Sequence, residues 1–195
     1  SYRLAIEKGD SVVHNLATKP NESMWFDWTP YMDQRGDAKI KSSFDLDRFK
    51  NLAHEAFTPP ENFVLQKQVE KIFSDRREMA DGKIPVNWGF AENMAYATLL
   101  DQGYPIRFSG QDIRRGTFSH RHAVIVNQED GLGHMPLVKI AENADTTIDI
   151  YDSLLSEEAV LGFEYGYSAT KPSGLVIWEA QFGDFANGAQ VVIDQ

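Results

Sequence analysis

Short apolar runs alternate with amphipathic segments along the second half of the chain, and this alternation restricts the fold most. Four runs rich in strand-forming residues are Ile106 to Phe108, Ala123 to Val126, Thr147 to Tyr151 and Leu175 to Trp178. Helical spacing of apolar residues covers Gly89 to Gln102, Ser156 to Tyr167 and Phe185 to Ile193. Alternating strands and helices favour an α/β fold, and we expect one mostly parallel sheet containing all four strands, flanked by helices.

The first 85 residues have a different character. A short helix is expected from Tyr2 to Glu7, followed by a polar, aromatic stretch, KPNESMWFDWTPYMDQRGD, that fits neither period. Two surface helices are expected from Asp47 to Ala56 and from Asn62 to Met79, separated by a proline pair. We therefore expect an N-terminal helical and irregular connecting arm at 1–85, and a domain at 86–195.

Two smaller patterns concern the ends of elements. The glycine pair in EDGLGH lacks the helix and third glycine of a phosphate loop, which leaves a hairpin or a crossover turn. The last helical pattern ends at VVIDQ without a stop signal. We expect the second domain to be truncated at its C-terminus and the chain to be a piece of a longer polypeptide.

Composition excludes several classes of protein. The 195 residues contain 42% hydrophobic residues, enough for a packed core, and no cysteine for a disulfide framework or a thiolate site. The net charge of −10 disfavours nucleic acid and anionic membranes as partners. No apolar run approaches the roughly 20 residues that span a bilayer. We expect an intracellular protein that binds neither nucleic acid nor membrane.

Ligands of an open parallel sheet bind where strands end, so the junctions after the strands deserve most weight. The first junction is DSLLSEE, residues 152–158, in which Ser153 or Ser156 can cap the next helix. Glu157 and Glu158 are suited to the first helical turn, where free amides stabilise a carboxylate. Because apolar residues surround them, we expect one of the two to be poorly hydrated.

The second junction is WEAQFGDFANG, residues 178–188. It combines two acids, two amide side chains, two phenylalanines and two glycines. This mixture suits a planar ligand that is held by stacking and hydrogen bonds. A tight turn with buried rings is an equally good interpretation, and periodicity does not separate the two.

The third junction, SGQDIRRGTFSHRH at residues 109–122, is the main basic segment of an acidic chain. Three arginines and two histidines could attract an anionic ligand, or the arginines could pair with carboxylates and fasten a structural loop. On a strand, His120 and His122 would share one face. A metal ion needs further ligands that have no obvious spacing here, so we predict no metal site.

Three long motifs at these junctions carry a family resemblance: SGQDIRRGTFSHRHAV, YDSLLSEEAVLGFEYGYS and VIWEAQFGDFANGAQVVIDQ. They resemble the pyrimidine-binding, transketolase-like domain of the thiamine-diphosphate-dependent first component of the 2-oxoglutarate dehydrogenase complex. The upstream segments FDWTPYMD and WGFAENMAYATLL are similar to the region that leads into that domain. The resemblance spans nearly the whole chain, but only a middle portion of the family's polypeptide.

The resemblance implies a role for each of several residues. Glu157, the first acid of SEE, matches the catalytic carboxylate that bonds to the aminopyrimidine ring of thiamine diphosphate and favours its imino tautomer. We therefore expect Glu157 to face the cleft, and Glu158 to face solvent or make a capping contact. Phe185, with Phe182 as second choice, matches the aromatic residue that stacks on that ring. His122 and His120 match loop histidines on the substrate side, and Arg115 matches a substrate-side arginine.

The resemblance also implies cofactors and partners. Thiamine diphosphate is expected, with magnesium bound by a domain that is absent from this chain. Expected partners are a second subunit that shares the active site in a homodimer, a lipoyl-bearing dihydrolipoyl succinyltransferase, and a small 2-oxo acid. A 2-oxoadipate-specific enzyme and a non-catalytic interaction module remain as alternatives. Both a bacterial cytoplasm and a mitochondrial matrix suit the chain.

Overall fold

The computed structural model describes residues 26–32, 42–181 and 188–194 of the chain. Two compact units divide the chain, Ser1–Ala38 and Lys39–Gln195. The first contains a 3₁₀ turn, η2 (Thr29–Tyr31), in which the rings of Trp28 and Tyr31 lie 5.9 Å apart. The helix expected from Tyr2 to Glu7 lies outside the described residues. Among the described residues, both sheets and all the α-helices lie in the second unit.

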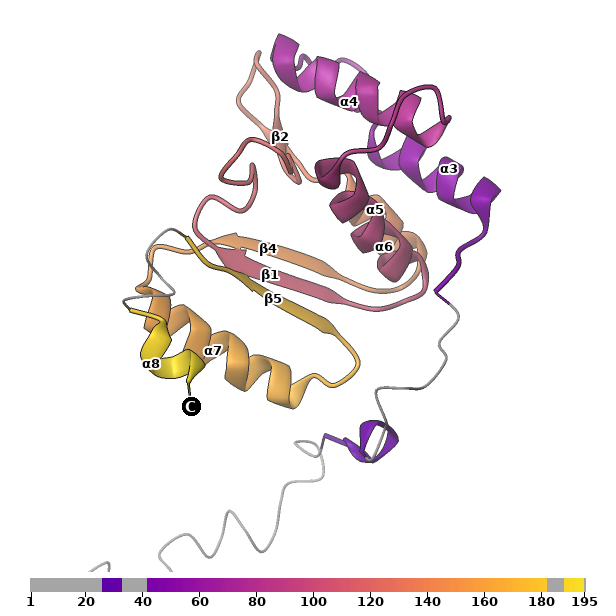
Figure 1. Ribbon diagram of the computed structural model, residues 1–195. Coiled ribbons are helices and arrows are strands. Elements are labelled where there is room, and N and C mark those ends of the chain that lie inside the picture. Colours follow the sequence, from indigo (N-terminus) through magenta and orange to yellow (C-terminus); the bar gives the residue numbers. More distant parts are fainter. Residues whose placement is uncertain (1–25, 33–41, 182–187, 195) are drawn as a thin grey trace, which may run out of the picture. The chain divides into compact units, whose positions relative to one another are not determined.

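Three parallel strands form the central sheet, in the order β4-β1-β5 (Figure 1). Their bounds are Ile106–Gly110 for β1, Ile148–Asp152 for β4 and Leu175–Glu179 for β5. Ile106 of the middle strand pairs with Ile148 on one side and Leu175 on the other. The expectation of a parallel α/β sheet flanked by helices is confirmed.

The expected fourth strand of this sheet is wrong. Only Ile125–Val126 (β2) is extended, and it pairs antiparallel with Gly133–His134 (β3) in a separate two-stranded sheet. The connection 127–132 is too short for a parallel crossover, which needs a dozen or more residues. The hairpin interpretation of EDGLGH is confirmed, and Gly131 provides the left-handed turn residue, with φ of 75°.

Helices cover both faces of the central sheet. On one face lie α5 (Trp88–Asp101) and α6 (Leu137–Asn143), and on the other lie α7 (Glu157–Thr170) and the single turn α8 (Gln190–Ile193), as Figure 1 shows. The start expected for the last helix, at Phe185, lies outside the described residues. Helix α6 was not expected, because seven residues span too few turns to show a clear period.

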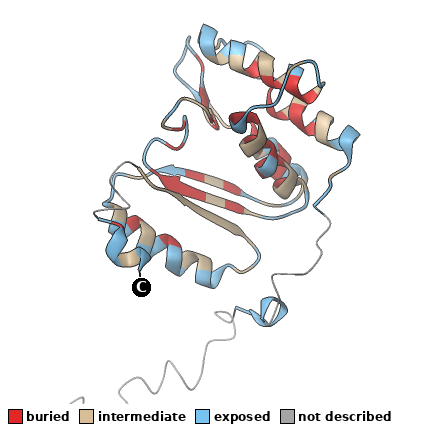
Figure 2. Cartoon of the chain, in the orientation of Figure 1, coloured by how far each residue is buried: buried red, intermediate tan, exposed pale blue. Residues whose placement is uncertain are grey.

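Helices α3 (Leu46–Ala56) and α4 (Lys67–Ala80) belong to the same core as α5. The ring of Phe57 lies 5.7 Å from Phe73 and 5.8 Å from Phe90. Buried residues accordingly extend from these helices to the facing side of the sheet (Figure 2). Helix α4 starts five residues later than expected, because Gln66 caps it by accepting the backbone N–H groups of residues 68 and 69.

A polar pair fastens α7 to the opposite face of the sheet. Arg107 of β1 donates from Nε to Oε2 of Glu164 at 2.7 Å, and only 4% of the Glu164 side chain is exposed. The guanidinium of Arg107 also lies over the rings of Tyr151 and Tyr167, 4.7 Å from each centroid.

None of the helices in the described part of the chain is long and apolar enough to cross a membrane.

Candidate functional site

The three parallel strands end together at one edge of the sheet. Gly110 of β1 pairs with Asp152 of β4 and with Glu179 of β5. The segments that follow them begin at residues 111, 153 and 180, so the three junctions expected to carry function meet at this edge. The carboxyl edge of a parallel sheet is the usual place for a ligand.

Glu157 begins the helix that follows β4. The hydroxyl of Ser156 accepts the backbone N–H of Ala159 at 3.4 Å and caps α7, which makes Glu157 its first residue. Glu157 is half-buried, whereas Glu158 is exposed. The expected difference in exposure between the two glutamates is therefore confirmed, whereas the expectation that Glu157 faces a cleft stays a prediction.

The Glu157 carboxylate lies against the loop that follows β1. Its Oε1 accepts a hydrogen bond from Nε2 of Gln111 at 3.2 Å, and a side chain at Gly188 would come within 3.1 Å of Oε2. An open groove of about 530 Å³ lies beside Gln111 and is lined by Gln111, Asp112, Asp152, Ser153, Leu154 and Leu155. Glu157 is not itself a lining residue, and it is connected to this groove through Gln111.

Gln181 ties the loop after β1 to the end of β5. Its Nε2 donates to the backbone oxygen of Gln111 at 3.1 Å and to the hydroxyl of Thr117 at 2.7 Å. The same hydroxyl donates to Oε1 of Gln181 at 3.0 Å. Two junctions are thereby held together directly beside Glu157. The other expected ligand contacts of this region, Phe182 and Phe185, lie outside the described residues.

The arginines of the basic junction are all paired with carboxylates. Arg114 lies 3.7 Å from Asp152, and Arg115 pairs with Asp112 three residues earlier. Arg121 pairs with both Glu92 and Glu179. The interpretation of this segment as a loop fastened by arginine pairs is confirmed for these three residues.

Arg121 is the most deeply placed of these arginines, with 1% of its side chain exposed. Its guanidinium donates to Glu92 at 2.9 Å and to the backbone oxygen of Ile113 at 2.8 Å, and lies 4.5 Å from the centroid of the Phe108 ring. Burial opposes its charge, but the hydrogen bonds with Glu179 and Glu92 outweigh burial and raise the pKa of Arg121. One side chain thus joins α5, β1, β5 and the loop.

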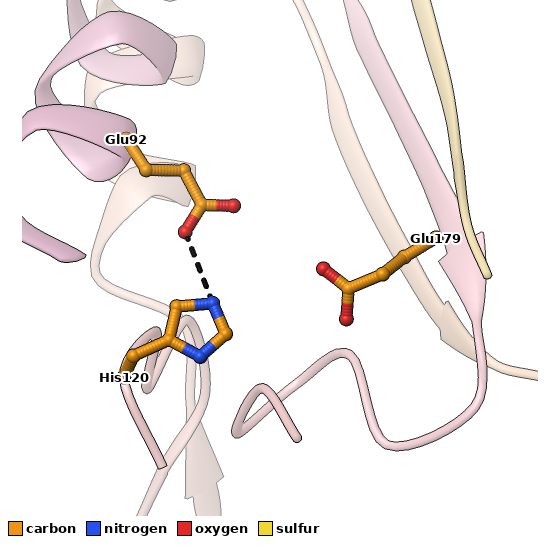
Figure 3. Close-up of side chains that lie close together, drawn as sticks. All are labelled: Glu92, His120 and Glu179. Atoms are coloured by element: carbon orange, nitrogen blue, oxygen red, sulfur yellow. Dashed lines mark ion pairs between the residues drawn. The ribbon is translucent and has the colours of Figure 1, made fainter. Parts of the chain in front are cut away.

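His120 lies beside this ion network, as Figure 3 shows. Its Nε2 is 3.5 Å from Oε2 of Glu92, and one ligand atom from each of Glu92, His120 and Glu179 lies within 4.8 Å of the others. This spacing would suit a metal ion, but the guanidinium of Arg121 already faces both carboxylates and would repel a cation. We therefore interpret the cluster as an ion network.

His120 and His122 do not lie on a strand, so the shared face that a strand would give them does not arise. Residues 119–122 form a loop, in which Ser119 and His122 adopt left-handed conformations with φ of 54° and 49°. Nε2 of His122 is buried and has no hydrogen-bond partner in the described part of the chain. Burial, and then the charge of Arg76, lower the pKa of His122, which favours the neutral ring.

The comparison with protein families decides the nature of this domain. A family model described as "Transketolase, pyrimidine binding domain" matches residues 84–195, which include β1, β4, β5 and all three junctions. The chain belongs to this family of pyrimidine-binding domains. The sequence resemblance to a transketolase-like domain is thereby confirmed.

Curated relatives match the pyrimidine-binding domain and the segment before it. The chain is 52% identical to the 2-oxoglutarate dehydrogenase E1 component of Azotobacter vinelandii over 194 residues, which cover 100% of this chain and 20% of that protein. The protein of the same name from Haemophilus influenzae is 50% identical, with the same coverage, and that from Coxiella burnetii is 46% identical over 100% of this chain and 21% of that protein. The chain spans about a fifth of the length of these relatives.

Two residues that organise the site of this pyrimidine-binding domain were missed from the sequence. Arg76 of α4 is 2% exposed and donates to the backbone oxygens of Arg121 at 3.0 Å and His120 at 2.5 Å. Burial lowers the pKa of Arg76 to about 10. Glu92 of α5 reaches the same loop. Both residues occupy ordinary positions in helical patterns, and no local signal indicates contacts with a loop so distant in the sequence.

Proposed function

We propose that this chain forms the pyrimidine-binding side of the active site in the first component of a 2-oxoglutarate dehydrogenase. That enzyme would decarboxylate 2-oxoglutarate oxidatively and transfer the succinyl group to a lipoyl group in the tricarboxylic acid cycle. The observation that carries the proposal is the half-buried Glu157 at the carboxyl edge of the sheet in a domain of this family. The names of the relatives favour 2-oxoglutarate over 2-oxoadipate as substrate.

The residues at the carboxyl edge fit the pyrimidine end of thiamine diphosphate. Oε1 of Glu157 is held by Gln111, and within the described residues Oε2 accepts no hydrogen bond. That oxygen is suited to an N–H group of a ring nitrogen, and Phe185 or Phe182 would stack on the ring. When bound, thiamine diphosphate supplies the electron sink that decarboxylation of a 2-oxo acid requires.

Glu157 would act as the catalytic proton holder. A carboxylate bonded to the ring nitrogen can share a proton with it, which fixes the tautomer of the exocyclic amine. The Ser156 cap places Glu157 at the first position of α7, and the amide of Gln111 donates to its carboxylate before any ligand binds. The contribution of this chain to catalysis is therefore a proton held at the carboxylate of Glu157.

His122, His120 and Arg115 are proposed to act on the substrate side. Nδ1 of His120 and Nε2 of His122 are buried atoms without a hydrogen-bond partner in the described residues, so the loop would have to uncover a ring N–H before a substrate oxygen could accept from it. Arg115 is more than half exposed and would have to share its charge between Asp112 and a substrate carboxylate.

The whole activity would belong to a longer polypeptide and its partners. No Gly-Asp-Gly sequence occurs in the 195 residues, so the diphosphate and magnesium would be held outside this chain. We propose a homodimer with a shared active site, and a complex with a lipoyl-bearing dihydrolipoyl succinyltransferase. Because the quoted relatives are bacterial, we propose the cytoplasm as compartment.

The test is Glu157→Gln in the full-length polypeptide. Loss of the proton-holding carboxylate should slow decarboxylation by about 10² to 10⁴ fold while the fold is retained. Proton–deuterium exchange at the thiazolium carbon, followed by NMR, should slow in parallel. Glu158→Gln, one residue further along an exposed surface, should retain the exchange rate. An unchanged exchange rate in Glu157→Gln would refute the proposed role.

A further inference from the structure

Three uncharged polar residues, Thr117, Gln181 and Gln111, are linked in series to Glu157, and the link passes from the backbone of Gln111 to its side chain. Thr117 contacts the amide of Gln181, and Gln181 donates to the backbone oxygen of Gln111 at 3.1 Å. Gln111 in turn donates from its side chain to Glu157 at 3.2 Å. The contacts join residues from three different junctions, separated by 46 to 70 positions in the sequence.

The backbone around Gln111 leaves little freedom for this arrangement. Gly110 has φ of 150°, and a side chain there would come within 2.7 Å of the backbone oxygen of Glu179 and 2.9 Å of Ile113. The following Asp112 is left-handed, with φ of 51°. The loop therefore leaves β1 in close contact with the end of β5, and the bond from Gln181 anchors it at the residue that reaches Glu157.

We propose that Gln181 is a positioning residue that orients the Glu157 carboxylate through Gln111. The inference rests on the proposed function, because it assigns a further residue to the same site. The charged neighbours Asp112, Arg114 and Arg115 are engaged in ion pairs, and Gln111 is the donor to Glu157 within the described residues. A neutral amide can fasten this donor without placing another charge beside the carboxylate.

Orientation matters here because proton transfer requires close alignment of donor and acceptor. A misplacement of about 1 Å can reduce the rate of a positioned step by about 10² fold. Without the bond from Gln181 to its backbone oxygen, Gln111 would no longer be held in place. Its side-chain amide would then lose its direction toward Glu157, and Glu157 would lose this hydrogen bond. The defect should appear in the catalytic step, since the groups that would hold the diphosphate and the substrate remain in place.

The test uses Gln181→Met in the full-length polypeptide, because methionine has a similar length and no amide. The turnover number should fall by about 10 to 100 fold, whereas KM for 2-oxoglutarate and the calorimetric Kd for thiamine diphosphate should change by less than about threefold. In the cofactor-free protein, hydrogen exchange of the amides at 111–117 should become faster. A joint loss of melting temperature, cofactor affinity and turnover would indicate a structural role and overturn the proposal.

Matched variants test the path through Gln111. If Gln181 acts through Gln111, then Gln181→Met should add nothing to the defect of Gln111→Met in a double-mutant cycle. Additive defects would overturn the proposal. Thr117→Val, which removes the hydroxyl, should show a weaker form of the same defect, and Thr117→Ser should restore the rate that Thr117→Val loses. These threonine variants keep the test decisive if Gln181→Met does not fold.

The two proposals fail differently. If Glu157→Gln retains its thiazolium exchange rate, the proposed function fails. If Glu157→Gln is inactive while Gln181→Met has normal turnover and normal hydrogen exchange, the function stands and the positioning role of Gln181 is overturned.

Discussion

His122 adopts a left-handed backbone conformation and is half-buried. Burial lowers its pKa, and the charges of Arg76, Arg115 and His120 act in the same direction. The unfolded chain therefore binds a proton at this ring more readily than the folded chain does. The free energy of unfolding must then decrease as the pH falls below about 6.5, the pKa of this histidine in the unfolded chain. The decrease levels off once the pH is below the pKa in the folded chain.

We predict that His122→Asn makes unfolding less sensitive to acid. Asparagine tolerates the left-handed conformation and does not titrate. The free energy of unfolding of the variant should therefore decrease less than that of the wild type as the pH falls below about 6.5. Urea unfolding at pH 5, 6, 7 and 8 measures this decline. His134, whose pKa is also lowered by burial, should account for part of the remaining slope. A variant with the wild-type slope would contradict the prediction.

At the scale of elements, Arg121 connects parts of the site that are far apart in the sequence. It binds Glu92 of α5 and Glu179 of β5, and its own backbone oxygen accepts from Arg76 of α4. Each partner lies on a different element. Arg121 is consequently a buried connection between elements as well as part of the candidate site.

We predict that Arg121→Met lowers the free energy of unfolding by about 3 to 5 kcal/mol, because two carboxylates lose their buried partner. Arg48→Met, which removes an ion pair with Asp101 from a side chain that is 45% exposed, should cost only about 0 to 1 kcal/mol. Denaturant unfolding compares the two. Adding Glu92→Gln and Glu179→Gln to Arg121→Met should recover stability, and a further loss in that triple variant would contradict the explanation.

At the scale of the whole molecule, the family match and the compact unit have different limits. The family model begins at residue 84, whereas the compact unit begins at Lys39. The segment between these limits contributes Leu52, Phe57 and Phe73 to the core that contains Phe90. Arg76 in the same region holds the loop at 120–122.

We predict that a chain of residues 86–195 does not fold cooperatively, whereas residues 39–195 do. Burial of each large apolar side chain contributes about 1.5 to 3 kcal/mol, so losing several of them removes an amount comparable to the 5 to 15 kcal/mol of a typical domain. Thermal unfolding followed by near-ultraviolet circular dichroism distinguishes the two chains. A cooperative transition in 86–195 would show that α3 and α4 are dispensable.

Patterns within short segments were sufficient for most elements and for part of the site. Helices α3, α5 and α7 lie within one to three residues of the expected bounds, as do the three strands of the central sheet, because apolar period and helix caps act over a few residues. The carboxyl edge followed from the alternation of strands and helices. The expectation that Glu157 is less exposed than Glu158 followed from the family resemblance of the SEE motif.

Contacts between distant segments required the fold itself. The run at Ala123 to Val126 has the composition of a sheet strand, but a short connection and a left-handed loop place Ile125 and Val126 in a hairpin instead. Similarly, nothing near Glu92 or Gln181 indicates that one meets Arg121 and the other meets Gln111. Their partners are chosen by how helices and loops pack around the sheet, since a side chain contacts whatever lies near it in space, whatever the separation along the chain.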